Sequence, residues 1–124
     1  PIYCTGLGKA FLTFLPEKER EELVSRLEFT PYTKNTITTK EDLYKQLETF
    51  REQGYSIDNE EIEVGLWCAA APVFGSSGRV EAAVSVAGPT VRMLENKEKI
   101  VRTLLKVTRE LSEKMGYTGR IYGK

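Results

Sequence analysis

The chain has no histidine, only two cysteines and no excess of either charge. Its 124 residues include 18 basic and 18 acidic side chains, so the formal net charge is zero. Domains that grip nucleic acid through its phosphates usually carry a basic excess, and this chain has none. Two cysteines without a histidine argue against a zinc site and against a disulfide scaffold. We therefore expect no metal and no other cofactor.

Long apolar runs are also missing. No run approaches the length that crosses a membrane, and no signal-peptide pattern is present, so the cytoplasm is the expected compartment. The length allows one domain at most, and an apolar share of 40% suffices for one core. The chain starts at Pro1 rather than at a methionine, from which we expect an internal piece of a larger protein.

Two apolar runs of strand length dominate the second half of the chain. Leu66–Phe74 and Val80–Ala87 flank Gly75-Ser76-Ser77-Gly78, a link of turn-forming residues. This pattern predicts an antiparallel hairpin. Because both runs are nearly free of charge, we expect both strands to lie in the middle of a sheet, mostly buried. Cys68 and Ser85 place small polar groups along the hairpin, which is typical of a small polar pocket.

Helical spacing predicts three helices before the hairpin. The first is capped by Thr5 and runs through Phe14. The second begins at Pro16 and ends near Leu27, with Leu23 and Leu27 facing the core. The third follows a threonine cap, spans Lys40–Gln53 and ends at Gly54; its apolar stripe consists of Leu43, Leu47 and Phe50. We expect the second and third helices to be plain, solvated covers.

The remaining elements complete an α+β pattern. Alternation predicts a short strand at Tyr55–Asp58, and a long last helix opens at Met93 or Leu94 and is capped by Gly116. The stripe of that helix would be Ile100, Leu104, Val107, Leu111 and Met115. Helices, a strand, a hairpin and a final helix in this order predict an antiparallel sheet covered by helices.

Two glycines, Gly6 and Gly8, fall in the first turn of the first helix, where each costs roughly 1 kcal/mol of helix propensity relative to alanine. Such glycines indicate that the backbone approaches something closely. One interpretation is tight packing against the sheet, which the segment alone favours. The other is a helix N-terminus whose free N–H groups hold an anion such as a carboxylate.

Catalytic chemistry has little support. A nucleophilic cysteine needs a base, and the chain has no histidine. Cys68 lies in an apolar strand, where a thiol is usually inert, while Cys4 before a helix start is the better thiolate candidate. Asp58 could act as a general base, but a single carboxylate does not define a catalytic mechanism. The carboxylates from Asp58 to Glu63 do not have the spacing of a calcium loop, so we interpret them as a solvated acidic turn. Binding without turnover fits better.

Four blocks of sequence resemble a known family. They are PIYCTGLGKAFLTFLPEKE, the threonine-rich segment with NTIT, GYSIDNEEIEVGLWCAAAPVF and GRVEAAVSVAGPTVRM. From Pro1 to about Met115 the chain resembles the effector-binding domain of IclR-family bacterial transcriptional regulators. The resemblance implies a GAF-like (profilin-like) α+β fold. It further implies a homodimer or tetramer, an effector that is a 2-oxo acid, sugar acid or aromatic acid, and DNA binding through a winged helix-turn-helix domain that precedes this region.

The resemblance also implies roles for particular residues. In relatives that bind 2-oxo acids, backbone N–H groups matching Gly6 and Leu7 hold the ligand carboxylate, which strengthens the anion interpretation. Asp58 would hydrogen-bond a ligand oxygen, and Ser85 would offer a hydroxyl. The remaining implied pocket residues are Leu66, Cys68 and Ala87. Where the family has a second serine this chain has Ala87, so the pocket should be more apolar there.

Two parts of the family pattern are missing from the sequence. They are the DNA-binding domain and the first part of the effector domain, so we expect residues 1–124 to be an incomplete effector-binding domain with an exposed sheet edge. The expected function is to sense an effector and control DNA binding allosterically through the oligomer. Two alternatives stay open: a GAF-like sensory module of another signalling protein, and a small enzyme that uses Asp58 and Cys68 on an oxo acid.

Overall fold

A three-stranded antiparallel sheet forms the centre of the molecule, which we describe for residues 1–119 from a computed structural model. The strands follow the chain order, β1 (Ser56–Asn59), β2 (Leu66–Phe74) and β3 (Val80–Pro89). The predicted hairpin is confirmed, and its link is closed by a hydrogen bond of 3.0 Å from Gly78 N–H to the Gly75 carbonyl. The α+β prediction is therefore correct.

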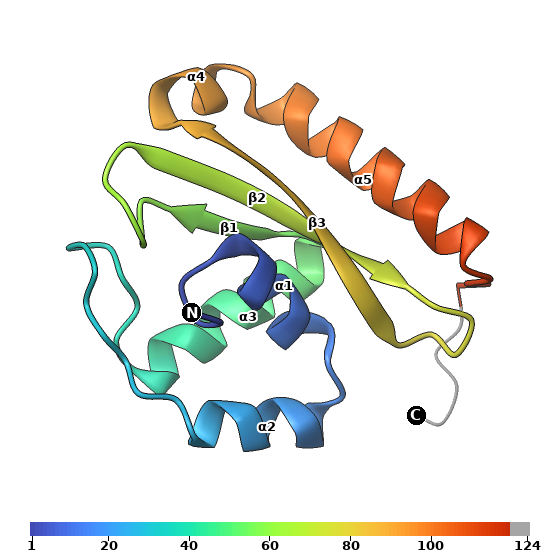
Figure 1. Ribbon diagram of the computed structural model, residues 1–124, viewed down its shortest axis with the longest axis horizontal. Helices are drawn as coiled ribbons and strands as arrows, with labels where there is room; N and C mark the ends of the chain where they lie inside the picture. The colour runs from blue at the N-terminus through green and yellow to red at the C-terminus, as the bar shows by residue number, and fades with distance from the viewer. Residues whose placement is uncertain (120–124) are drawn as a thin grey trace.

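Helices cover both faces of this sheet (Figure 1). The N-terminal helices α1 (Gly6–Phe14), α2 (Glu17–Ser25) and α3 (Lys40–Gln53) lie on one side, and α5 (Lys97–Lys114) crosses the other. The short helix α4 (Thr90–Glu95) joins β3 to α5 at one end of the sheet. Two apolar cores result, one between α1, α3 and the sheet, and one between the sheet and α5.

The two strands of the hairpin differ in burial. β2 is central and is buried along almost its whole length. The prediction that β3 also lies mid-sheet and mostly buried is wrong: among the described residues it pairs only with β2, and Ser85 and Ala87 are exposed. One edge of the sheet therefore carries unpaired backbone groups along β3.

Local capping explains where the predicted helices begin and end. The Thr5 hydroxyl accepts the Gly8 N–H at the start of α1, and the Thr39 hydroxyl accepts the Asp42 N–H at the start of α3. Gly54 ends α3 with φ of 89°, a left-handed conformation that favours glycine. The stripe predicted for α3 is confirmed, since Leu43, Leu47 and Phe50 are all buried.

The prediction for the core face of the second helix is confirmed for Leu27, which lies just after α2 and packs against the α1–α3 core, and is wrong for Leu23. Leu23 is 39% exposed, whereas Val24 is 1% exposed and packs in the α1–α3 core. Arg20 is also buried and donates to the carbonyls of Thr13 and Leu15. The helix is thus tied to the end of α1 by a cation, and it is not a plain solvated cover.

The last helix is divided and rotated relative to the prediction. Asn96 separates α4 from α5, with its amide donating to the Arg92 carbonyl. The buried residues of α5 are Leu104, Thr108 and Ser112, at spacings of four, so the predicted stripe members Val107, Leu111 and Met115 are exposed by 38–46%. Thr108 and Ser112 can be buried because each hydroxyl donates to a backbone carbonyl of its own helix. The Ser112 hydroxyl also accepts the Phe74 N–H.

The glycine at position 8 makes a close backbone contact, which leads to a testable prediction. A Cβ atom built there would lie 2.5 Å from the Cα and carbonyl oxygen of Ile2. Gly8→Ala should therefore lower the free energy of unfolding by about 1–3 kcal/mol through overpacking. Helix propensity alone would instead raise it by about 1 kcal/mol. Urea unfolding followed by circular dichroism gives the sign, and a stabilised variant would contradict the contact.

Candidate functional site

The strand register brings three of the predicted site residues into one row. Cys68 on β2 lies opposite Asp58 on β1 and opposite Ala87 on β3. Paired residues point to the same face of a sheet. That face is the one beneath α1, because a Cβ atom built at Gly6 would meet the Sγ of Cys68 at 2.7 Å. The row therefore runs across all three strands under the start of α1.

The first turn of α1 approaches this row through its backbone. The Ser56 hydroxyl donates to the Gly6 carbonyl at 2.6 Å and holds the helix start against β1. The Gly8 N–H donates to the Thr5 hydroxyl, and the Lys9 N–H donates to the Thr5 carbonyl. The Leu7 N–H has no acceptor within residues 1–119. Leu7 is 42% exposed, and its free backbone N–H is a group that the family resemblance assigns to the ligand carboxylate.

Asp58 is a buried carboxylate at one end of the row. Its side chain is held by the turn that follows β1, since Oδ1 accepts the Glu61 N–H at 2.8 Å. Burial raises the pKa of Asp58, and backbone N–H groups together with the charge of Lys9 oppose that rise. The turn therefore holds the Asp58 carboxylate in place, and the pKa of this group depends on the charges around it.

The Cys68 thiol lies in the middle of the row and is buried. Burial and the negative charge of Asp58 raise its pKa, while hydrogen bonds from the Ser85 hydroxyl and the Gly6 N–H act in the opposite direction. Burial also raises the pKa of Cys4 to about 11, so Cys4, the better thiolate candidate of the two by sequence, is a neutral thiol at pH 7. Both cysteines are free thiols suited to packing rather than to nucleophilic chemistry.

The other two predicted side chains, Ser85 and Leu66, each lie two residues along their strand from the row. Ser85 is opposite Ala70 in the neighbouring row, and Leu66 is opposite Pro89 at the other side. Alternation puts Ser85 and Leu66 on the same face as Cys68. The structure thus gathers Gly6, Asp58, Cys68 and Ala87, with Ser85 and Leu66 flanking them. On the β3 side the site is open.

A buried ion pair next to the row was not predicted from the sequence. Lys9 on α1 is fully buried, and its Nζ lies 2.5 Å from Oε2 of Glu61 and 3.0 Å from the side-chain oxygen of Gln46 on α3. Glu61 is 2% exposed. The interpretation of residues 58–63 as a solvated acidic turn is therefore wrong for Asp58 and Glu61. The signal for this pair was a lone lysine within an otherwise apolar helix segment, GLGKAFLTF.

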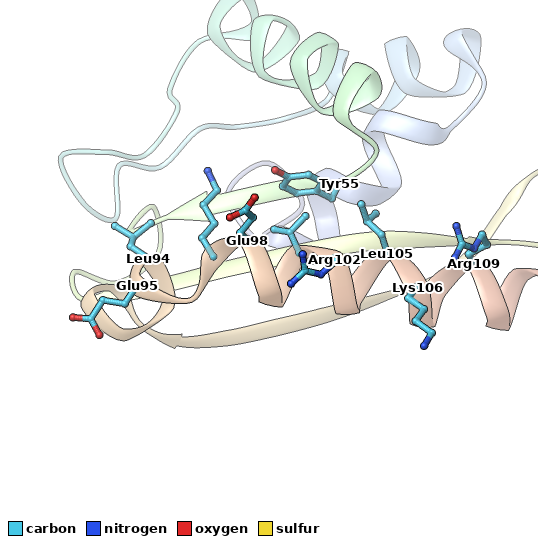
Figure 2. A pocket seen from close by; sticks show the side chains of 10 residues that line it. Tyr55, Leu94, Glu95, Glu98, Arg102, Leu105, Lys106 and Arg109 are labelled. Atoms are coloured by element: carbon cyan, nitrogen blue, oxygen red, sulfur yellow. The ribbon is translucent and has the colours of Figure 1, made fainter.

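Two shallow grooves lie on the α5 side of the molecule rather than at the row. The larger, of about 880 Å³, runs between Tyr55 and the outer face of α5, with Leu94 and Leu105 among its apolar residues and Arg102 and Arg109 beside them (Figure 2). The second, of about 490 Å³, follows β3 and α5 and includes Ser85. Neither groove is lined by Gly6, Asp58 or Cys68.

Within residues 1–119 no group of three or more histidine, cysteine, aspartate or glutamate side chains has an arrangement that could hold a metal ion. None of the described helices combines the length and apolar character needed to cross a membrane.

Comparison with known proteins gives consistent matches over nearly the whole chain. Residues 1–113 match the family described as bacterial transcriptional regulator IclR C-terminal. The HTH-type transcriptional regulator KdgR of Dickeya chrysanthemi is 42% identical over 118 residues, which are 94% of this chain and 39% of KdgR. The chain therefore spans less than half of this relative. The relatives KdgR and YiaJ are named as transcriptional regulators, so these matches support a regulator and not the enzyme alternative.

Solved structures agree with the fold described above. The Thermotoga maritima IclR structure is 40% identical with a TM-score of 0.89, and the match covers 94% of this chain and 47% of that one. A double mutant of the PobR inducer-binding domain from Acinetobacter, in complex with 3-hydroxybenzoic acid, is 25% identical with a TM-score of 0.81; the match covers 90% of this chain and 65% of that one. The expected GAF-like arrangement is confirmed by such neighbours, and the alternative of an unrelated signalling module is excluded. The chain belongs to the family of C-terminal domains of IclR-type bacterial transcriptional regulators.

Proposed function

We propose that the chain is the effector-sensing domain of an IclR-type transcription factor and binds a small organic acid between α1 and the sheet. The observation that carries this proposal is the row of Asp58, Cys68 and Ala87 beneath Gly6. The start of α1 covers this row and offers a positive helix N-terminus for the carboxylate of an acid, while Asp58 in the row offers a directional group for its other polar atoms.

The first turn of α1 would hold the ligand carboxylate. The Leu7 N–H is free of other acceptors within the described chain, and an N-terminal turn favours negative charge. Asp58 and Ser85 would hydrogen-bond the remaining polar atoms, while Leu66 and Ala87 supply apolar wall. The complex of the PobR domain with 3-hydroxybenzoic acid supports an acid as the ligand class. We keep 2-oxo acids, sugar acids and aromatic acids within this class.

Control of transcription would then be allosteric. In the proposed arrangement, DNA is bound by a winged helix-turn-helix domain outside residues 1–124, and the effector changes how protomers pair in a dimer or tetramer. A ligand can shift such an equilibrium only by its difference in affinity for the two states. Support for a longer protein comes from relatives such as KdgR, of which the chain covers 39%.

Melting temperatures measured against a panel of acids test the binding site. The panel contains glyoxylate, pyruvate, a sugar-derived 2-oxo acid and 3-hydroxybenzoate. At a concentration about 100 times Kd a ligand stabilises by about 2.7 kcal/mol, which corresponds to a rise of several degrees. We expect a saturable rise with at least one acid, and we expect Asp58→Ala and Ser85→Ala each to remove it.

The control variant is Ser77→Ala, which removes an exposed hydroxyl in the hairpin link. This variant should show the same rise as the wild type. A rise that persists in both Asp58→Ala and Ser85→Ala would place the ligand elsewhere. No rise with any acid of the panel would contradict the proposed ligand class.

A further inference from the structure

The ion pair of Lys9 belongs to a larger buried cluster that has an unequal number of charges. Asp58 and Glu61 are 3% and 2% exposed, and Lys9, which contacts Glu61, is fully buried. Lys9 interacts electrostatically with both carboxylates. Two carboxyl groups against one amine leave a net charge of −1, whichever partner of the Lys9–Glu61 pair holds the proton between them. A lone buried negative charge is costly unless it is neutralised.

No other described group supplies the missing positive charge. The side chains that face the cluster are Cys4 before α1, Gln46 from α3 and Cys68 from β2. Burial raises the pKa of both thiols, so both are neutral, and the amide carries no charge. Burial likewise raises the pKa of Asp58 and of Glu61, while Lys9 only partly opposes that rise.

One oxygen of the cluster has no hydrogen bond. Oε2 of Glu61 accepts from Lys9 and Gln46, whereas Oε1 is buried and has no partner among the described residues. The turn that carries Glu61 cannot easily move this oxygen into water. Thr33 and Thr36 hold the turn by donating hydrogen bonds to the backbone carbonyls of Glu60 and Glu61. A carboxylate oxygen fixed in this way favours the protonated form of the group.

We propose that Asp58 and Glu61 form a single proton-binding site beneath the first turn of α1, and that an acid ligand is bound there together with one proton. The second half of this inference depends on the proposed function, whereas the first half does not. Because the two carboxyl groups interact, the proton belongs to the pair rather than to either residue. A bound ligand carboxylate would add a second uncompensated negative charge, and the proton removes it.

The expected consequence is a pH-dependent affinity. Uptake of one proton on binding makes the affinity fall about tenfold per pH unit above the pKa of the free cluster, and level off below it. Acid ligands would therefore be sensed more strongly at mildly acidic pH. Without the proton site, the affinity would not change between pH 5.5 and 8, because the ligand carboxylate itself is ionised throughout that range.

Carboxyl-carbon NMR of the ligand-free protein tests the proton site. Through-bond correlation to the assigned backbone identifies the carbons of Asp58 and Glu61 without any variant. We expect one titration of this pair at a higher pH than that of ordinary carboxyl groups, and its disappearance in Glu61→Gln. Glu63→Gln, which changes an exposed carboxylate in the same segment, should leave it unchanged. Ordinary acidic titration of both carbons would overturn the proposal.

Calorimetry with pyruvate and 3-hydroxybenzoate tests the coupling. Titrations in two buffers of different ionisation enthalpy, between pH 5.5 and 8, count the protons taken up; we expect about one in the wild type and none in Glu61→Gln. Binding without proton uptake in the wild type would overturn the coupling. If neither acid binds at any pH, the proposed function fails for these acids, and the NMR titration still decides the proton site.

Discussion

Replacing Lys9 with methionine is expected to lower the free energy of unfolding by about 3–5 kcal/mol, because it leaves buried carboxylates without their cation. Lys9 is fully buried, and its Nζ contacts Glu61 at 2.5 Å and Gln46 at 3.0 Å. The methionine retains most of the apolar stem beside Phe50, so the loss reports the charge rather than packing. Urea unfolding followed by circular dichroism at pH 7 measures it.

Two variants make this experiment specific. Lys18→Met removes an exposed lysine and should change stability by less than about 0.5 kcal/mol. The double variant Lys9→Met with Glu61→Leu replaces the pair by apolar groups and should recover much of the loss. A loss below about 1 kcal/mol for Lys9→Met would show that the pair is not buried as described.

Trp67→Ala is the second change with a large expected effect. Trp67 is 2% exposed and lies on the opposite face of β2 from Cys68, in a core with Met93 and Leu104. Removing a buried tryptophan leaves a cavity and is expected to cost about 3–5 kcal/mol. Unfolding is followed by circular dichroism, because this is the only tryptophan of the chain and its fluorescence is lost with it.

Trp67→Phe is the matched control. It keeps an aromatic ring between β2 and α5 and should cost clearly less than the alanine variant. Equal losses for both variants would indicate that a polar contact of the indole, rather than its volume, stabilises this core. A loss under about 1 kcal/mol for Trp67→Ala would contradict its burial against α5.

Local patterns were sufficient to predict most elements of the fold. Threonine caps, a terminating glycine and apolar spacing placed α1 and α3 correctly, and the turn formers placed the hairpin. The same patterns failed for β3, because small apolar residues such as Ala82 and Ala83 suit an edge strand as well as a central one. They also failed for α5, where Thr108 and Ser112 are buried through hydrogen bonds that no apolar pattern reveals.

The candidate site shows a similar limit. The family resemblance was enough to assign Asp58, Cys68 and Ala87 to one pocket, whereas the strand register that places them in one row is visible only in the structure. Lys9 and Glu61 were missed because they are 52 residues apart and meet only when α1 packs on the sheet. Charge balance in a buried cluster is a property of the folded chain, and a sequence read locally shows only an acidic stretch and one lysine.

The order of the strands has a consequence for how the site is assembled. Strands that neighbour one another in sequence also pair in space, so the sheet is built from short chain closures. Helix α1 joins it only through distant contacts, such as the Ser56–Gly6 bond across 50 residues, which close long loops at a greater entropic cost. Because the site needs both the sheet and the first turn of α1, it is complete only after these long loops have closed, and a change that loosens α1 would affect the site directly.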